Sequence, residues 1–207
     1  MSLGAAQIDR YSRQIILPEV GGRGQERLLG ARVLLAGHDD AAVATATLLG
    51  RAGVGTLHLV AGPASLPELS PDCRVERIAD GVPVPDADVF VDVRGGATAA
   101  LGREAARHRR PLVLAVAHGA GGAVATLVGQ PCGACVPPDA LGVGGREPAS
   151  AGAAPAVVLA VGAVAAAEAL AILLGARPKG RVQRVDVGGG SAVALVGSGC
   201  ALCKADP

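Results

Sequence analysis

Apolar and polar residues are grouped along the chain in blocks that predict an α/β fold. Short apolar runs at 32–37 and 55–62 flank an apolar stretch long enough for a helix, which is the pattern of a β-α-β unit with parallel strands. Runs at 88–93 and 111–117 flank a second helical stretch, at 97–110, and repeat this pattern. The first half of the chain therefore predicts a mainly parallel sheet flanked by helices.

The second half of the chain has a different period. A run at 122–129 follows a glycine turn and is expected to lie antiparallel to the preceding strand. The last two runs, 181–189 and 191–198, predict a hairpin that ends the sheet in an antiparallel extension. Residues 62–88 are rich in proline, glycine and acidic side chains and are expected to form mostly loop, and residues 146–155 are expected to be disordered.

We expect a single domain, because 207 residues can bury a sizeable core and no linker divides the chain. It comprises an N-terminal helical arm at 1–30, a strand-and-helix core at 31–129, and a C-terminal part at 130–207 that contains a long Ala-rich helix at 154–177. That helix is long enough to span a membrane. Glu168 in its middle instead favours burial in the core or at a subunit interface.

Composition narrows the functions that this domain can have. The net charge is +1 and the only aromatic residues are Tyr11 and Phe90, so the chain lacks the electrostatic footprint and the stacking platform of nucleic-acid-binding proteins. The first twenty residues carry Asp9, Arg10 and Arg13 within their apolar stretches, unlike a signal peptide. We therefore expect a cytoplasmic protein with reduced thiols, with neither a nucleic acid nor a membrane as partner.

Two Cys-x-x-Cys pairs carry the strongest chemical signal in the sequence. Cys132 and Cys135 form one pair, and Cys200 and Cys203 form the other. In a chain with reduced thiols this spacing is typical of a four-thiolate zinc site, which leaves no open position on the metal and is therefore structural. Redox-active pairs and free core thiols are the alternatives. Zinc is favoured because neither pair begins a helix in a β-α-β context.

The turn between the first strand and the helix that follows it lacks the glycines of a phosphate-binding turn. A dinucleotide- or ATP-binding unit places small residues there so that backbone amides approach the phosphates. This chain places His38, Asp39 and Asp40 there, and one of the two aspartates is expected to cap the helix.

The charge of these aspartates opposes phosphate binding. A phosphate charge about 4 Å from a carboxylate experiences roughly 4 kcal/mol of repulsion at an effective dielectric constant of about 20. Two carboxylates and several phosphate charges would cancel the roughly 8 kcal/mol that a micromolar affinity represents. A magnesium ion that bridged Asp39 or Asp40 to the phosphates would be the way around this repulsion.

Five segments in this order resemble the ThiF/MoeB/HesA family. They are RYSRQIILPEVGGRGQERLLGARVLLAG at 10–37, AGVGTLHLV at 52–60, PCGACV at 131–136, GAVAAAEALAILLGA at 162–176, and CALC at 200–203. The family comprises bacterial relatives of ubiquitin-activating enzymes, which adenylate the C-terminus of a small ubiquitin-like sulfur carrier. The resemblance implies a Rossmann-like fold, ATP and magnesium as ligands, the same four-cysteine zinc site, and a dimer.

The chain departs from the family where the family's chemistry resides. The family's glycine-rich turn falls on Gly37, His38, Asp39, Asp40, Ala41 and Ala42. Only Gly37 keeps a glycine of that pattern. The ribose-binding acid of the family falls at Ala61, its metal-binding aspartate at Gly95, and the catalytic cysteine of some members near Pro148, whereas Asp92 keeps an earlier acid. The resemblance therefore implies a degenerate nucleotide site.

Three further residues have a functional and a simpler interpretation. Arg13 matches the family arginine that contacts ATP phosphates in the neighbouring subunit, so it is a candidate trans-acting contact, and an interface arginine kept with its motif is the simpler interpretation. Cys73 is a thioester acceptor or redox thiol in the functional interpretation. Nothing beside it marks an activated thiolate, so a loop cysteine is the simpler interpretation. His118 follows a strand at the edge where ligands bind, but no base or nucleophile is near it in the sequence.

Together these features predict a shortened family member with a degenerate ATP site. We expect a non-catalytic scaffold or partner subunit in a sulfur-carrier or ubiquitin-like activation pathway, with structural zinc. It would form a homodimer, or a heterodimer with an intact paralogue, and a ubiquitin-like sulfur carrier is a further expected partner. Two alternatives stay open: an active adenylyltransferase with a rearranged loop, and a pseudoenzyme that binds a different small ligand beside Asp39 and Asp40.

Overall fold

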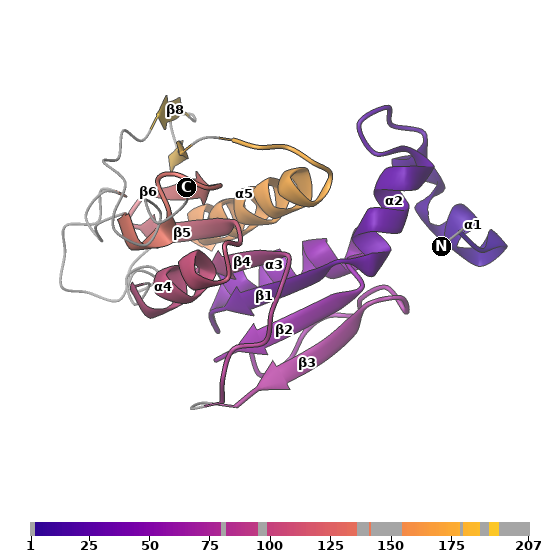
Figure 1. The fold of residues 1–207 in the computed structure, drawn as a ribbon, viewed down its shortest axis with the longest axis horizontal. Coiled ribbons are helices and arrows are strands. Elements are labelled where there is room, and N and C mark those ends of the chain that lie inside the picture. Colours follow the sequence, from indigo (N-terminus) through magenta and orange to yellow (C-terminus); the bar gives the residue numbers. More distant parts are fainter. Residues whose placement is uncertain are drawn as a thin grey trace.

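The described part of the chain forms one eight-stranded sheet with helices on both faces (Figure 1). The computed structural model describes residues 3–79, 82–94, 99–135, 141, 155–178, 180–186 and 191–194. The strands are β1 (Arg32–Ala36), β2 (Thr56–Val60), β3 (Arg74–Ile78), β4 (Val89–Asp92), β5 (Leu112–His118), β6 (Gly121–Leu127), β7 (Arg181–Asp186) and β8 (Ser191–Ala194). The helices are α1 (Ala5–Ile15), α2 (Gly21–Gly30), α3 (Asp40–Arg51), α4 (Ala99–Arg107) and α5 (Pro155–Leu173), with a 3-10 turn at Gly133–Cys135.

The strand order is β3-β2-β1-β4-β5-β6-β7-β8. The first five strands in this order are parallel, in the arrangement of a doubly wound sheet. The last three add antiparallel to β5 and to one another. This confirms the predicted mainly parallel sheet, the antiparallel strand within 122–129 and the C-terminal hairpin.

Alternate residues of the central strands point to opposite faces of the sheet and build two cores. On one face, Val33 and Leu35 of β1 are fully buried in a cluster with residues of α3 and α5. On the other, Leu34 and Phe90 are fully buried with residues of α4. The central parallel strands are therefore apolar on both sides, which explains their continuous apolar runs.

α5 is a core helix, as the sequence predicts. It is long and apolar enough to cross a membrane by length and composition, and half of that window is buried inside the protein. Glu168 is 4% exposed, and its carboxylate accepts a 2.6 Å hydrogen bond from Thr126 Oγ1 as well as hydrogen bonds from Arg181 and Gln183. Because all these partners come from β6 and β7, the carboxylate in the middle of the helix fixes α5 to the sheet.

The predicted N-terminal arm is helical, with α1 at the periphery and α2 between α1 and the sheet (Figure 1). Gln25 of α2 is fully buried and donates a 3.0 Å hydrogen bond to the carbonyl of Ala52, which attaches the arm to the end of α3. The side chains of Ile8, Ile16 and Leu17 remain 50%, 77% and 47% exposed. The arm thus presents apolar side chains to its surroundings.

The prediction of a mostly loop segment at 62–88 is wrong at one place. Residues 74–78 form β3, which pairs in parallel with β2 at the edge of the sheet. Three of its five residues are charged, which is typical of an edge strand that is exposed on one side. The predicted disordered segment at 146–155 lies outside the described residues except for Pro155, which begins α5.

Candidate functional site

The turn from β1 to α3 lies at the carboxyl edge of the parallel strands, where doubly wound sheets bind ligands. Gly37 has φ +145°, a conformation that favours glycine, and a Cβ at this position would lie 2.5 Å from Cγ2 of Val93. Its amide donates a 3.3 Å hydrogen bond to the carbonyl of Val60. Close contacts with β2 and with the end of β4 therefore require the one glycine that this turn keeps.

Asp39 is the aspartate that caps α3. Its side chain accepts a 3.1 Å hydrogen bond from the amide of Ala42, and Asp40 begins the helix. An amide of the first helical turn thus binds a carboxylate of this chain. That amide is one of the groups that would bind an external anion at a helix N-terminus.

Asp92 at the end of β4 is also bound by a neighbour in the chain. Its carboxylate is fully buried and accepts hydrogen bonds from the backbone amide of Arg94 at 3.0 Å, from Nε at 3.0 Å and from Nη2 at 2.6 Å. The hydrogen bond with Asp92 raises the pKa of Arg94 above the ordinary value of arginine, more than burial lowers it. Arg94 and the buried carboxylate thus form an ion pair. Gly95, the expected position of the metal-binding aspartate, lies outside the described residues.

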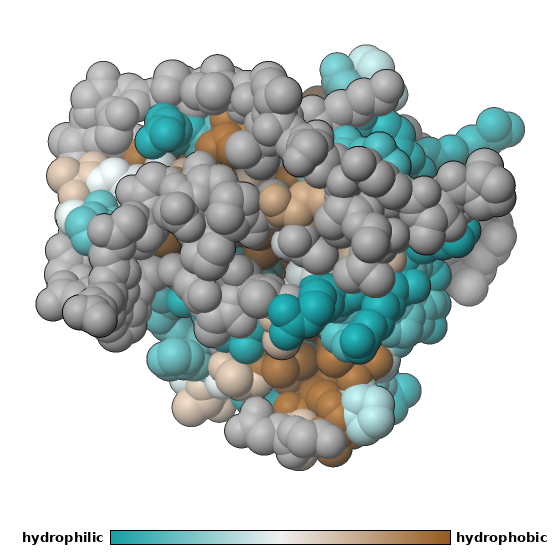
Figure 2. All heavy atoms as spheres, turned by 60° about the vertical axis from the view of Figure 1, so that its left-hand side comes forward, coloured by the Kyte–Doolittle hydropathy of each residue, from teal (hydrophilic) through white to brown (hydrophobic). Residues whose placement is uncertain are grey.

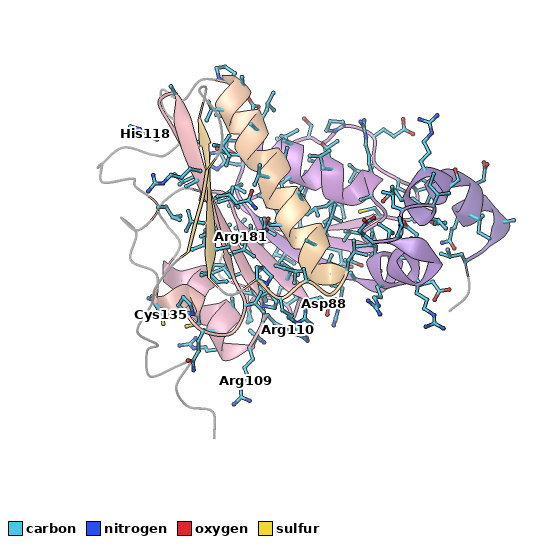
Figure 3. All side chains as sticks on the ribbon, turned by 90° about the horizontal axis from the view of Figure 1, so that it is seen from above. Asp88, Arg109, Arg110, His118, Cys135 and Arg181 are labelled. Carbon is cyan, nitrogen blue, oxygen red and sulfur yellow. The ribbon has the colours of Figure 1, made fainter. Side chains whose placement is uncertain are left out.

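Among the described residues, no acid directly follows β2 or β5 at the carboxyl edge of the sheet. Ala61 follows β2 in a left-handed conformation, with φ +47°. Arg77 of β3 donates hydrogen bonds to the carbonyls of Pro63 at 2.7 Å and Ala64 at 3.1 Å, and so fixes the segment after Ala61. His118 is exposed at the end of β5 (Figure 3).

Seen from the carboxyl ends of the strands, the described surface mixes hydrophilic side chains with an apolar area at its lower end (Figure 2).

The opening motif divides into a buried and an exposed part. Tyr11 is 1% exposed, and its hydroxyl lies 2.5 Å from Ser70 Oγ and donates a 3.0 Å hydrogen bond to Asp72. Arg10 forms an ion pair with the same carboxylate at 2.5 Å. Burial acts to raise the pKa of Asp72, but the hydrogen bonds from Gln7, Tyr11 and Arg10 outweigh it and hold the pKa below its usual value. Arg13 on the same helix is exposed and has no ion pair within the described residues.

The cysteines differ in their surroundings. The sulfur atoms of Cys132 and Cys135 are 3.8 Å apart across the 3-10 turn. Two thiolates bound to one tetrahedral zinc at about 2.3 Å are about 3.8 Å apart, so this pair has the spacing of such a site. Cys200 and Cys203 lie outside the described residues. Burial raises the pKa of the Cys73 thiol to about 11, which keeps it protonated at neutral pH and unreactive.

Comparisons with known proteins identify relatives of this chain. No protein-family model matches it. The vegetative HesA protein of Trichormus variabilis is 30% identical over 178 residues, which cover 67% of this chain and 67% of HesA. The SAMP-activating enzyme E1 of Haloferax volcanii is 47% identical over 60 residues, which cover 29% of this chain and 22% of that enzyme.

The fold is similar to that of a solved protein. The crystal structure of E. coli MccB with ATP matches 97% of this chain and 75% of MccB, with a TM-score of 0.73 and 15% sequence identity. At this identity the match concerns the fold. The described sheet and helices thus share the architecture of that protein.

Proposed function

Because this chain belongs to the ThiF/MoeB/HesA family, we propose that it is a non-catalytic member that serves as a scaffold or partner subunit in the activation of a small ubiquitin-like sulfur carrier. The similarity to HesA over two thirds of each chain supports the pathway, and a second relative is a SAMP-activating enzyme. A cytoplasmic location follows from this role.

The observation that carries the non-catalytic role is the cap of α3. Asp39 occupies the amide of Ala42, and Asp40 adds a second carboxylate in the first turn. A helix N-terminus binds phosphate through free amides and the positive end of its dipole. Here one of those amides is used and the local charge is negative. ATP bound in the family's manner would meet roughly 4 kcal/mol of repulsion for each close charge pair.

The buried Asp92 supports the same proposal. A carboxylate that binds magnesium needs an oxygen open to the ion. Both oxygens of Asp92 accept hydrogen bonds from Arg94, and the guanidinium cancels the carboxylate's charge. Recruiting this acid for a metal would require the ion pair to break. The geometry thus favours a site that has lost its metal ligand over one that has been rearranged to bind it.

The decisive experiment is isothermal titration of the full chain with ATP and magnesium. We expect no measurable binding to the natural protein. The variant Asp39→Asn/Asp40→Asn removes both charges and keeps a capping side chain, because asparagine caps as well as aspartate. The variant Asp39→Gly/Asp40→Gly removes the charges and frees the amide. We expect binding to improve in the order natural, Asn variant, Gly variant.

A control and a contrary result complete this test. Asp9→Asn removes one aspartate charge from the exposed face of α1, and it should leave the titration with ATP and magnesium unchanged. Micromolar binding to the natural protein that is lost in the Asn variant would overturn the proposal. It would mean that the two aspartates hold magnesium, and the chain would then have to be assayed as an adenylyltransferase.

We also propose that Cys132, Cys135, Cys200 and Cys203 hold one structural zinc ion. The spacing of the first two sulfur atoms fits a tetrahedral site, and four thiolates leave no position for substrate. The ion would stabilise the fold and supply no chemistry. We expect metal analysis to find one zinc per chain, Cys132→Ser to lose it, and Cys73→Ser to keep it. Zinc retained in Cys132→Ser would contradict the assignment.

The partner is proposed to bind the N-terminal arm. Arg13 is exposed, and Ile8, Ile16 and Leu17 expose apolar surface on the same arm. Such a surface is typical of an interface, and it suits either a second copy or an intact paralogue. We expect light scattering to show a dimer or, with the paralogue added, a heterodimer. Ile16→Asp should weaken either assembly, and Arg13→Gln should lower the activity of the intact paralogue without changing the assembly.

A further inference from the structure

A cavity of about 530 Å³ lies at the amino edge of the parallel strands, opposite the edge described above. The ends of α2, α5 and β6 and the residues that precede β1, β4 and β5 form its walls. Asp88 and Arg110 lie beside the carboxyl-terminal end of α5 (Figure 3). The volume is within the range of small-molecule sites, roughly 300–1,000 Å³.

Four arginines and two carboxylates line the cavity, and one of the arginines is paired with a carboxylate outside the lining. Arg110 is neutralised within the protein. It donates hydrogen bonds to both oxygens of Asp86, at 3.1 and 2.8 Å, and lies 3.7 Å from Asp88. Asp88 in turn accepts a 2.9 Å hydrogen bond from the amide of Arg32. These contacts fix one wall and leave little free charge on it.

Two other arginines of the lining are bound differently. Arg27 of α2 donates a 3.3 Å hydrogen bond to the carbonyl of Leu174, and Arg177 donates to the carbonyls of Ala176 at 3.1 Å and Ile172 at 3.4 Å. Neither has a carboxylate within 4.0 Å in the described part of the chain. Both side chains therefore cap the C-terminus of α5 and keep their full charge. The negative end of the helix dipole offsets only about half an elementary charge.

The same cavity has an apolar side. Val128, Ile172 and Leu173 line it, and Ile172 is only 4% exposed. No aromatic residue is among the lining residues. A ligand would find aliphatic contact next to the two guanidinium groups, but no ring on which to stack a base. An anion with an aliphatic portion fits this combination.

We propose that the cavity binds a small phosphomonoester whose organic part is aliphatic, held by Arg27 and Arg177. A phosphomonoester carries about −1.5 to −2 charges at neutral pH, which matches the two arginines without carboxylate partners, whereas a carboxylate would balance only one of them. The planar guanidinium donates paired hydrogen bonds to phosphate oxygens. The site does not depend on the proposed function, because it lies at the opposite edge of the sheet.

Titration calorimetry of the full chain with butyl phosphate tests the proposal. We expect butyl phosphate to bind saturably and about tenfold more tightly than pentanoate. The reason is that a hydrogen bond between a charged donor and a charged acceptor contributes strongly to affinity. Adenosine monophosphate should gain nothing over butyl phosphate, since no ring stacks on its base. Affinity should fall as the pH drops from about 7.5 to about 5, because the phosphate protonates with a pKa near 6.

Variants show which arginines act. Arg27→Gln/Arg177→Gln should weaken butyl phosphate binding about tenfold or more. Arg177→Lys alone keeps the charge and loses the planar guanidinium that donates paired hydrogen bonds. This variant should weaken butyl phosphate binding less. The control Arg23→Gln/Arg103→Gln removes two exposed arginines that do not line the cavity, and should leave affinity within about twofold. No binding at about 10 mM butyl phosphate, equal losses in both double variants, or equal binding of pentanoate overturns the proposal.

Discussion

The two edges of the parallel sheet differ in how their charged side chains are neutralised. At the carboxyl edge, Asp39 binds a helix amide and Asp92 binds the guanidinium of Arg94. At the amino edge, Arg27 and Arg177 bind carbonyl oxygens and keep their charge. At the edge where doubly wound proteins bind ligands, two carboxylates are thus bound within the chain. The opposite edge retains charge for an external partner.

One helix connects these two edges. Gly162 in the first half of α5 packs on the start of α3, while Ile172 and Leu173 at its end line the cavity. Thr45 Oγ1 donates hydrogen bonds to the carbonyls of Ala41 at 2.7 Å and Gly162 at 3.0 Å. The position of α3, and with it the cap at the carboxyl edge, therefore depends on close contact with α5.

The largest expected effect is that of Gly162→Val. A Cβ at this position would lie 2.5 Å from the carbonyl oxygen of Ala41 and 3.0 Å from its Cα. Because these are backbone atoms, α3 and α5 must separate, and we expect the free energy of unfolding to fall by about 2–3 kcal/mol. Urea denaturation measures it. Ala167→Val places the same side chain on the exposed face of α5 and should cost less than about 1 kcal/mol. A loss in Gly162→Val no larger than that in Ala167→Val would show that the contact between the helices relaxes at little cost.

The next effect concerns the cap of α3. Asp39→Ala removes the acceptor of the Ala42 amide, and we expect the free energy of unfolding to fall by about 1 kcal/mol. Asp39→Asn keeps an acceptor and should cost only a few tenths of a kcal/mol. Thermal unfolding at low salt separates the two. If both variants lost the same stability, the carboxylate would act by its charge on the helix dipole and not by the hydrogen bond.

Ala61→Gly should stabilise the protein. Ala61 has φ +47°, which costs a residue with a Cβ about 1–2 kcal/mol and a glycine nothing. Glycine loses more entropy on folding, by roughly 0.5–1 kcal/mol, so the net gain is about 0.5 kcal/mol. Ala64→Gly, at an exposed position with ordinary backbone conformation, provides the control and should lower stability. A loss in Ala61→Gly would mean that the local backbone changes with the substitution.

The features that could be predicted from the sequence are those carried by local patterns. The apolar runs predicted β1, β2, β4 and β5, and the polar turn predicted the cap of α3. The strand β3 was missed, because three of its five residues are charged and it lies between proline-rich segments. The pair formed by Asp92 and Arg94, two residues apart, was open to prediction. Nothing in the sequence indicated that the acid would be fully buried.

The cavity at the amino edge could not be predicted. Its two key arginines, Arg27 and Arg177, are far apart in the sequence, and each by itself is a cation at the end of a helix. Only the fold brings the end of α2 to the end of α5. The same holds for the partners of Glu168, which come from two strands. Sites assembled from distant helix ends have no spacing pattern, whereas the Cys-x-x-Cys pairs have one.

The smallest expected effect distinguishes the neutralised wall of the cavity from its free arginines. The hydrogen bond from Arg110 holds the pKa of Asp86 below its usual value, so the ionised form is favoured in the folded state. This contribution is present above the unfolded-state pKa of about 3.9 and is lost as the pH falls through the lower folded-state pKa. Because the pair is partly exposed, we expect only about 0.3 kcal/mol. Asp86→Asn should therefore lower stability slightly at pH 7 and leave it unchanged well below both pKa values. In an Arg110→Gln background the same substitution should have no effect at either pH. A pH-dependent loss that persisted without Arg110 would assign the stabilisation to Arg32 or His108, which also lie near this carboxylate.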